Sequence, residues 1–260
     1  MTTNRQFSLS VDSLVELKQD TAAPLSKPVL VTPTLSRVLL EIGSLPREAL
    51  FLGMALDGLP VLLNLHDSTP GSVLVVGDAG SGKTAFLQML ARSVQQTHHS
   101  ESVKFGVITN HSDEWENIET TQHRVGLFST SQNGARDFIS SLVTWAHANN
   151  KSGHSILLLI DDLEAVAKFE PETLQNLRWL LLRGPAHKVW PVITMNAERY
   201  GQVLSWIPMF RTRIFGKIAK EQIAAALGSD SASALNQLEA GLQFSLRENG
   251  KWLKFWLPSC

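Results

Sequence analysis

Short apolar runs alternate with segments of helical periodicity along most of this chain. The apolar runs predict β-strands at residues 72–76, 103–108, 125–128, 156–160, 189–194 and 212–215. The periodic segments predict helices at residues 84–94, 135–148 and 172–182. Because strands and helices follow one another in turn, the pattern favours an α/β fold with a mostly parallel central sheet and helices on both faces.

Two predicted hairpins flank this alternating region. Residues 50–65 hold two apolar runs joined at Asp57-Gly58, and residues 242–257 hold two more joined at Glu248-Asn249-Gly250. Sequences of this kind suit tight turns with positive φ. We therefore expect one α/β domain over residues 46–260, whose parallel sheet carries antiparallel hairpins.

The first 45 residues have a different character. They fit no long helical or strand period, and Pro24, Pro28 and Pro33 interrupt them. The pattern predicts an N-terminal arm or linker over residues 1–45, in which the amphipathic segment Leu35–Ile42 is the best candidate for docking. A flexible lead-in and an arm that docks, for example onto a protein partner, both remain open.

Composition narrows the class of protein. Apolar residues make up 43% of the 260, enough for a real core, and the net charge of −1 argues against binding to nucleic acid through bulk charge. The single cysteine, Cys260, excludes a disulfide scaffold and a cysteine-based zinc cluster.

Targeting and membrane signals are weak. The first residues lack the apolar stretch of a secretory signal. The most apolar long window, Ala49–Leu65, is broken by Gly53, Asp57, Gly58 and Pro60 and falls short of the ~20 apolar residues that span a bilayer. We expect a soluble, cytoplasmic chain with no membrane segment of its own.

The strongest chemical signal is the run Gly77-Asp-Ala-Gly-Ser-Gly-Lys-Thr84, which fits the P-loop pattern G-x-x-x-x-G-K-[ST] and lies between a predicted strand and helix. Glycines let successive N–H groups converge on phosphate oxygens at the positive end of a helix. The run predicts a site for ATP, in which Lys83 reaches the β- and γ-phosphates and the Thr84 hydroxyl ligates Mg²⁺. The expected nucleotide-binding residues are Gly77, Asp78, Ala79, Gly80, Ser81, Gly82, Lys83, Thr84 and Ala85.

A second signal follows the apolar strand 156–160. Asp161 comes directly after it and is the candidate Walker B aspartate, which holds Mg²⁺ directly or through water. Either Asp162 or Glu164 would polarise the attacking water. An ordinary strand that ends in a solvated acidic turn is the alternative interpretation.

Further candidates lie near the next two strands. The strand at 189–194 ends in polar side chains, so Thr194 and Asn196 are candidates for a group beside the γ-phosphate. Arg183, Arg211 and Arg213 flank predicted strands, and any one of them could neutralise charge at the nucleotide of a neighbouring subunit. A solvated or helix-end cation is the alternative for each arginine.

The order of these motifs resembles that of the FtsK/SpoIIIE family. Five segments carry the resemblance. They are Leu52-Gly-Met-Ala-Leu-Asp-Gly-Leu-Pro-Val-Leu62, the strand and P-loop at residues 72–84, the strand and Walker B acids at residues 156–162, the stretch from Arg183 to Thr194, and Phe210-Arg-Thr-Arg-Ile-Phe215. It covers roughly residues 50–257. It implies a RecA-like P-loop ATPase core with an additional strand, commonly assembled as a homo-oligomeric ring of six, that moves DNA or, in the EccC branch of type VII secretion, protein.

The sequence departs from the family pattern in three places. Asp162 stands where the family usually has glutamate, Met195 replaces a common glutamine, and Thr109-Asn110-His111 replaces a common Asp-Pro-Lys. The resemblance as a whole implies an ATP-hydrolysing motor domain acting on DNA or translocated protein, and the departures leave an alternative open. That alternative is an EccC-like nucleotide-gated binding or scaffold module with little hydrolysis and no DNA translocation.

Overall fold

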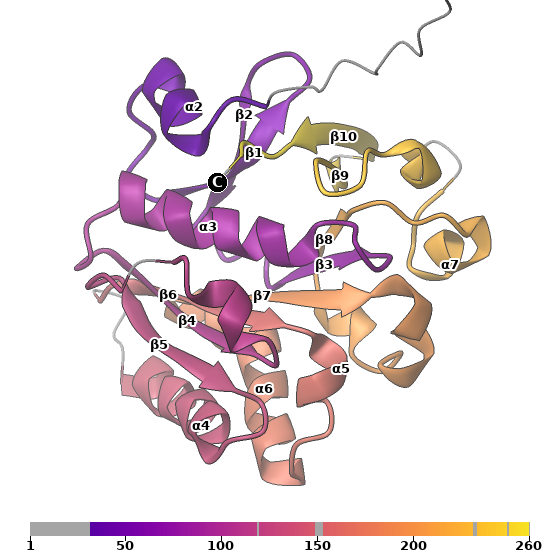
Figure 1. Ribbon diagram of the computed structural model, residues 1–260. Helices are drawn as coiled ribbons and strands as arrows, with labels where there is room; N and C mark the ends of the chain where they lie inside the picture. The colour runs from indigo at the N-terminus through magenta and orange to yellow at the C-terminus, as the bar shows by residue number, and fades with distance from the viewer. Residues whose placement is uncertain (1–31, 119, 149–152, 231–232, 249, 260) are drawn as a thin grey trace, which may run out of the picture. The chain divides into compact units, whose positions relative to one another are not determined.

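Parallel strands make up one half of a ten-stranded sheet in the computed structural model, which describes residues 32–118, 120–148, 153–230, 233–248 and 250–259 (Figure 1). The parallel half contains, in spatial order, β8 (Thr212–Phe215), β3 (Val73–Gly77), β7 (Val189–Asn196), β6 (Ser155–Asp161), β4 (Val103–Thr109) and β5 (Arg124–Ser129). β7 lies between β3 and β6, which makes it the additional strand of a RecA-like P-loop fold. The fold class predicted from the sequence is confirmed.

Helices cover both faces of this half. α3 (Lys83–Thr97) packs Phe86, Leu87 and Leu90 into the core on one face. The other face is covered by α4 (Asn133–Ala148), α5 (Leu163–Val166) and α6 (Pro171–Arg183), as Figure 1 shows. The central strands β3 and β6 are buried along their whole length, which explains why their sequences are nearly continuous apolar runs. No helix among the described residues is long and apolar enough to cross a membrane.

The antiparallel half extends the sheet beyond β8. Its strands, from β8 outward, are β9 (Gln243–Glu248), β10 (Lys251–Trp256), β1 (Ala49–Ala55) and β2 (Pro60–Asn64). Both predicted hairpins are therefore present, and β1 pairs with β10, so that the two hairpins join into one sheet. A short helix, α7 (Glu221–Ala226), lies in the connection between β8 and β9.

The segment before β1 joins the same core. Helix α2 (Leu35–Ile42) buries Leu35 and Val38 in the cluster that α3 and β1 share, and Leu35 N–H donates to the carbonyl of Ser259. The compact unit therefore begins at Thr32. This corrects the 45/46 boundary for residues 32–45, because an amphipathic face that packs on its own domain belongs to that domain. The rest of the predicted arm, 1–31, lies outside the described residues.

Gly53 holds β1 against β10. Its φ is +149°, and a Cβ at this position would lie 2.6 Å from Cδ2 of Phe255 and 2.7 Å from the carbonyl oxygen of Trp256. Gly53→Ala should therefore lower the free energy of unfolding by about 1–3 kcal/mol, measured by urea denaturation. Gly201→Ala is the control, because nothing lies within 4 Å of its Cβ. Equal losses in the two variants would contradict this account of the β1–β10 contact.

Candidate functional site

The carboxyl ends of β3, β7 and β6 meet at one edge of the sheet. In the parallel register Gly77 of β3 is opposite Asn196 of β7, and Ile193 of β7 is opposite Ile160 of β6. The polar residues that follow the three strands are therefore neighbours, although they lie far apart in the sequence. Parallel sheets bind their ligands at this edge.

The loop of residues 77–82 leads from β3 into α3. Gly80 and Gly82 have φ values of +72° and +89°, a region that favours glycine. Within the described chain, the N–H groups of Ala79, Gly80 and Gly82 donate to no protein acceptor. Ala79 and Gly80 are exposed at the crest of the loop. The loop thus presents free N–H donors at the positive end of α3.

Lys83, the first residue of α3, turns back toward the loop. Its Nζ donates to the carbonyl oxygens of Gly77 at 3.1 Å and Asp78 at 2.8 Å. Burial lowers the pKa of the Lys83 ammonium, and the charges of Asp161, Glu164, Asp78 and Asp162 oppose that shift. The cation is therefore held over the loop and surrounded by carboxylates.

Two distant segments support the loop from outside. Asp78 N–H donates to the Lys217 carbonyl at 2.9 Å, and Asp78 Oδ2 accepts from Ala219 N–H at 2.8 Å. Gly241 N–H donates to the Ser81 carbonyl at 3.2 Å, and a Cβ on Gly82 would lie 2.6 Å from Gly241 Cα. These supports were missed by sequence reasoning, because nothing local marks a contact between residues about 140 or more positions apart.

Asp161 is the centre of a hydroxyl network. Thr84 Oγ1 donates to its Oδ2 at 2.9 Å, and Thr194 Oγ1 donates to its Oδ1 at 2.8 Å. The residue is 8% exposed, so these two bonds replace hydration that the carboxylate loses. The structure therefore joins the end of β6 to α3 and to β7 through one carboxylate.

Asp162 makes the turn after β6. Its backbone has φ +93°, and its N–H donates to Thr194 Oγ1 at 2.8 Å. Its Oδ1 accepts from the Glu164 N–H at 3.1 Å, and its Oδ2 lies 4.0 Å from the Arg199 guanidinium. The Asp162 carboxylate thus caps α5 and faces a partly exposed cation.

Glu164 is the more buried of the two candidate acids. It is 3% exposed, its Oε1 accepts from the Asn196 N–H at 2.9 Å, and its Oε2 has no partner among the described residues. Burial, with a smaller contribution from Asp162, raises the pKa of the Glu164 carboxyl to about 8. A carboxyl with a free oxygen and such a pKa can exchange a proton near neutral pH.

The remaining predicted residues have different positions. The Asn196 side chain accepts from the Glu198 N–H and caps the following turn, so it is the Asn196 backbone that holds Glu164. Ala85 is exposed in the first turn of α3. The Arg213 guanidinium donates to the carbonyls of Leu227 and Ile207, and burial lowers its pKa. Arg183 and Arg211 precede β7 and β8, at the opposite sheet edge from the loop.

The donors and acceptors at this edge fit a triphosphate with a magnesium ion. Free N–H groups and the Lys83 ammonium suit anionic oxygens, while the Thr84 hydroxyl and the Asp161 carboxylate are the oxygen ligands that Mg²⁺ prefers. Together with the additional strand β7, they define a P-loop nucleoside triphosphatase domain. The family model of the AAA domain matches residues 66–200, which span β3 through β7, and the chain belongs to that family.

Solved structures of similar fold agree with this class. ATPases 2 and 3 of EccC from Thermomonospora curvata, in complex with a signal sequence peptide, share 16% identity with a TM-score of 0.68 over 88% of this chain. EssC ATPases 2 and 3 from Geobacillus thermodenitrificans share 13% over 84% of this chain, with a TM-score of 0.62. The pCW3 conjugation coupling protein TcpA with ATPγS shares 14% over 87%, with a TM-score of 0.62.

These matches confirm the resemblance to FtsK/SpoIIIE-type ATPases at the level of the fold. This chain spans 43% of the EccC chain, 46% of the EssC chain and 69% of the TcpA chain. A comparison of the sequence with curated proteins finds no significant match.

The raised pKa of Glu164 predicts a pH-dependent stability. In the unfolded chain the carboxyl ionises near 4.5, whereas in the folded chain it keeps its proton up to about 8. Between these values the unfolded state binds fewer protons, so the free energy of unfolding should fall as the pH rises. The Glu164→Gln variant lacks this titration, and wild type should therefore lose stability relative to it between about pH 5 and 8.

The measurement is urea denaturation of both proteins at several pH values, in EDTA and without nucleotide. The difference between the two free energies isolates the Glu164 carboxyl from all other groups that titrate. Parallel stability curves would contradict the buried, protonated state of Glu164.

Proposed function

We propose that this domain binds ATP with Mg²⁺ at residues 77–85 and Asp161, and that it hydrolyses the nucleotide. The observation that carries the proposal is the bond between Thr84 Oγ1 and Asp161 Oδ2, 2.9 Å long. This bond brings the hydroxyl of the P-loop and the carboxylate of β6 together. The two side chains that would hold Mg²⁺ are thus close together, although β7 lies between the strands that precede them.

The chain's own residues divide the binding of the nucleotide among them. The free N–H groups of Ala79, Gly80 and Gly82 would hold phosphate oxygens, and Lys83 would exchange its carbonyl acceptors for the β- and γ-phosphates. Thr84 and Asp161 would hold Mg²⁺, which when bound neutralises charge on those phosphates. Thr194 keeps Asp161 oriented by its own hydrogen bond.

Glu164 is better suited than Asp162 to polarise the attacking water. Its Oε2 has no hydrogen-bond partner among the described residues, and with a pKa of about 8 the carboxyl is ionised in part near neutral pH, which is the form that can take a proton from water. Asp162 has one oxygen bound to the Glu164 N–H and the other directed at Arg199. We therefore assign the role of general base to Glu164 and a supporting role to Asp162.

Lys83→Ala should abolish measurable binding of ATP with Mg²⁺. Removing one member of a buried, hydrogen-bonded charge pair costs about 2–5 kcal/mol, which is roughly 30- to 4,000-fold in Kd. Isothermal titration of wild type and variant measures the change. Lys251→Ala, which removes an exposed cation from β10, should bind as wild type does. Unchanged affinity in Lys83→Ala would overturn the assignment of the loop.

Glu164→Gln should retain ATP binding and lose turnover. General acid–base catalysis contributes about 10²–10⁴-fold, so a loss in that range is expected in phosphate-release assays. Asp162→Asn should reduce turnover less, because its carboxylate is occupied by structural contacts. The reverse order of effects would make Asp162 the base.

The substrate moved by such an ATPase is DNA or a translocated protein. The EccC structure with a signal sequence peptide and the TcpA conjugation coupling protein are precedents for related folds. The net charge of −1 does not favour DNA held by bulk charge. The alternative is a nucleotide-gated binding or scaffold module with little hydrolysis. This alternative would be favoured if the wild-type protein bound ATP but did not hydrolyse it.

We further propose that the domain works as a homo-oligomeric ring, six-membered as the resemblance implies. Among the three candidate arginines, Arg213 is bound to carbonyls of its own chain, whereas Arg183 is exposed at the end of α6. Arg211 is exposed as well, so Arg183 and Arg211 are both better placed than Arg213 to reach a neighbour's nucleotide, where such an arginine contributes about 10³-fold or more. Turnover that rises with protein concentration, or with duplex DNA, would support the ring, and concentration-independent turnover by a monomer would contradict it.

A further inference from the structure

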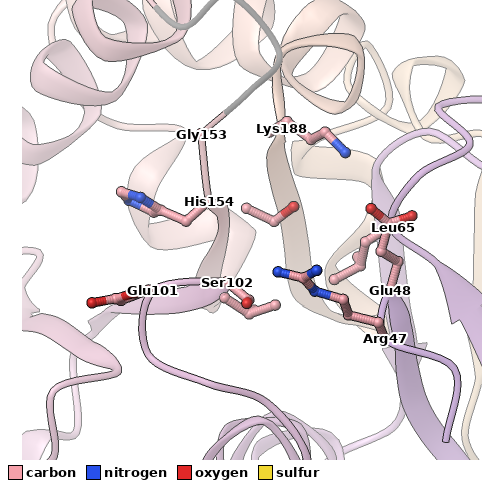
Figure 2. Close-up of a pocket in the computed structure, with 10 residues that line it drawn as sticks. Arg47, Glu48, Leu65, Glu101, Ser102, Gly153, His154 and Lys188 are labelled. Carbon is pink, nitrogen blue, oxygen red and sulfur yellow. The ribbon is translucent and has the colours of Figure 1, made fainter.

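A cavity of about 260 Å³ lies at the sheet edge opposite the P-loop (Figure 2). Its walls come from the amino ends of parallel strands, at Val103 of β4 and Ser155 of β6, and from Lys188 just before β7. Arg47, Glu48 and Leu65, beside the β1–β2 hairpin, also line it. None of its lining residues belongs to the nucleotide site.

Two cations of this cavity are available to a ligand. Among the described residues, neither Arg47 nor Lys188 forms an ion pair. The neighbouring Glu48 carboxylate lies 3.1 Å from His66 Nδ1 instead. Figure 2 shows the Arg47 guanidinium directed into the space between the strand ends, whereas the Glu101 carboxylate points away from it.

A serine hydroxyl lines the same space. Ser155 as a whole is 7% exposed, and its Oγ has no hydrogen-bond partner among the described residues. The oxygen itself is accessible from the cavity, so it can donate a hydrogen bond to a ligand there.

Backbone hydrogen bonds fix the strand ends around the Ser155 hydroxyl. Ser155 N–H donates to the Ser102 carbonyl and Ile156 N–H to the Lys188 carbonyl, each at 2.8 Å. Lys188 itself is held at φ +65°, an uncommon conformation for a lysine.

We propose that this cavity binds the phosphate group of a small phosphomonoester. Three donors here suit phosphate oxygens: the guanidinium of Arg47, the ammonium of Lys188 and the hydroxyl of Ser155. A phosphomonoester carries about −1.5 to −2 charges at pH 7, which matches two unpaired cations better than a carboxylate does.

The size of the cavity indicates an organic phosphate. Its volume is many times the ~10–15 Å³ that a cavity needs to hold one water molecule, which is more than one tetrahedral anion fills. Leu65 and Val103 form an apolar part of the cavity wall, which the organic part of the ligand can contact. Burial lowers the pKa of the His154 imidazole, so this lining residue is neutral at pH 7.

The test uses the full chain carrying Lys83→Ala, so that phosphate binding at the P-loop does not contribute. Glycerol 3-phosphate, inorganic phosphate and glycerol are titrated into it by calorimetry. Glycerol 3-phosphate should bind saturably and glycerol should not. Arg47→Gln/Lys188→Gln in the same background should weaken binding at least tenfold, and Ser155→Ala severalfold. The matched control, Lys168→Gln/Lys251→Gln, removes two exposed cations elsewhere and should change nothing.

Each outcome bears on the proposal. Binding of inorganic phosphate as tightly as glycerol 3-phosphate, lost in the Arg47/Lys188 variant, supports the phosphate site with the free anion as its source. Absence of binding by both phosphates, or equal binding by the double variant and its control, overturns the proposal. Thermal unfolding of every variant verifies the fold, and Ser155→Ala tests the site without altering charge. Because ATP binding at the P-loop is measured separately, failure here leaves the proposed function untouched.

Discussion

The Asp161 carboxylate, which accepts one hydroxyl hydrogen bond at each of its oxygens, holds together the edge of the sheet at which β3, β7 and β6 end. Thr84 donates from α3 and Thr194 from β7, so the three elements converge on one side chain. A carboxylate that is 8% exposed needs such donors, because its burial removes water. The same Thr194 hydroxyl also accepts from the Asp162 N–H, which fixes the turn after β6.

The geometry exists because β7 pairs in parallel with β3 on one side and β6 on the other. If β3 and β6 were direct neighbours, no side chain from a third strand could bridge their ends. The inserted strand supplies Thr194 to Asp161 and the Asn196 N–H to Glu164. Both acids are therefore positioned by β7, and the site depends on a strand that contributes no residue of the P-loop.

The antiparallel half contributes to the site indirectly. The turn before β9 places Gly241 against Gly82, and the segment after β8 bonds to Asp78. β10 in turn pairs with β1, and Ser259 bonds to Leu35 of α2. A continuous set of contacts thus links α2 and both hairpins to the loop of residues 77–82, so the hairpins support the edge of the sheet at which β3, β7 and β6 end.

The sequence alone determined the fold class, both hairpins and the residues of the P-loop and of Asp161, because these depend on local signals. Apolar runs indicate buried strands, Asp57-Gly58 indicates a turn, and the glycines of residues 77–82 indicate a loop of unusual backbone conformation. Only the tertiary structure showed that Glu164 is buried whereas Asp162 caps α5, that Arg213 donates to carbonyls of its own chain, and that α2 packs on the core. The physical reason is that desolvation and hydrogen-bond partners depend on segments distant in sequence: Glu164 is buried and bound by Asn196, 32 positions away, and no local pattern encodes that contact.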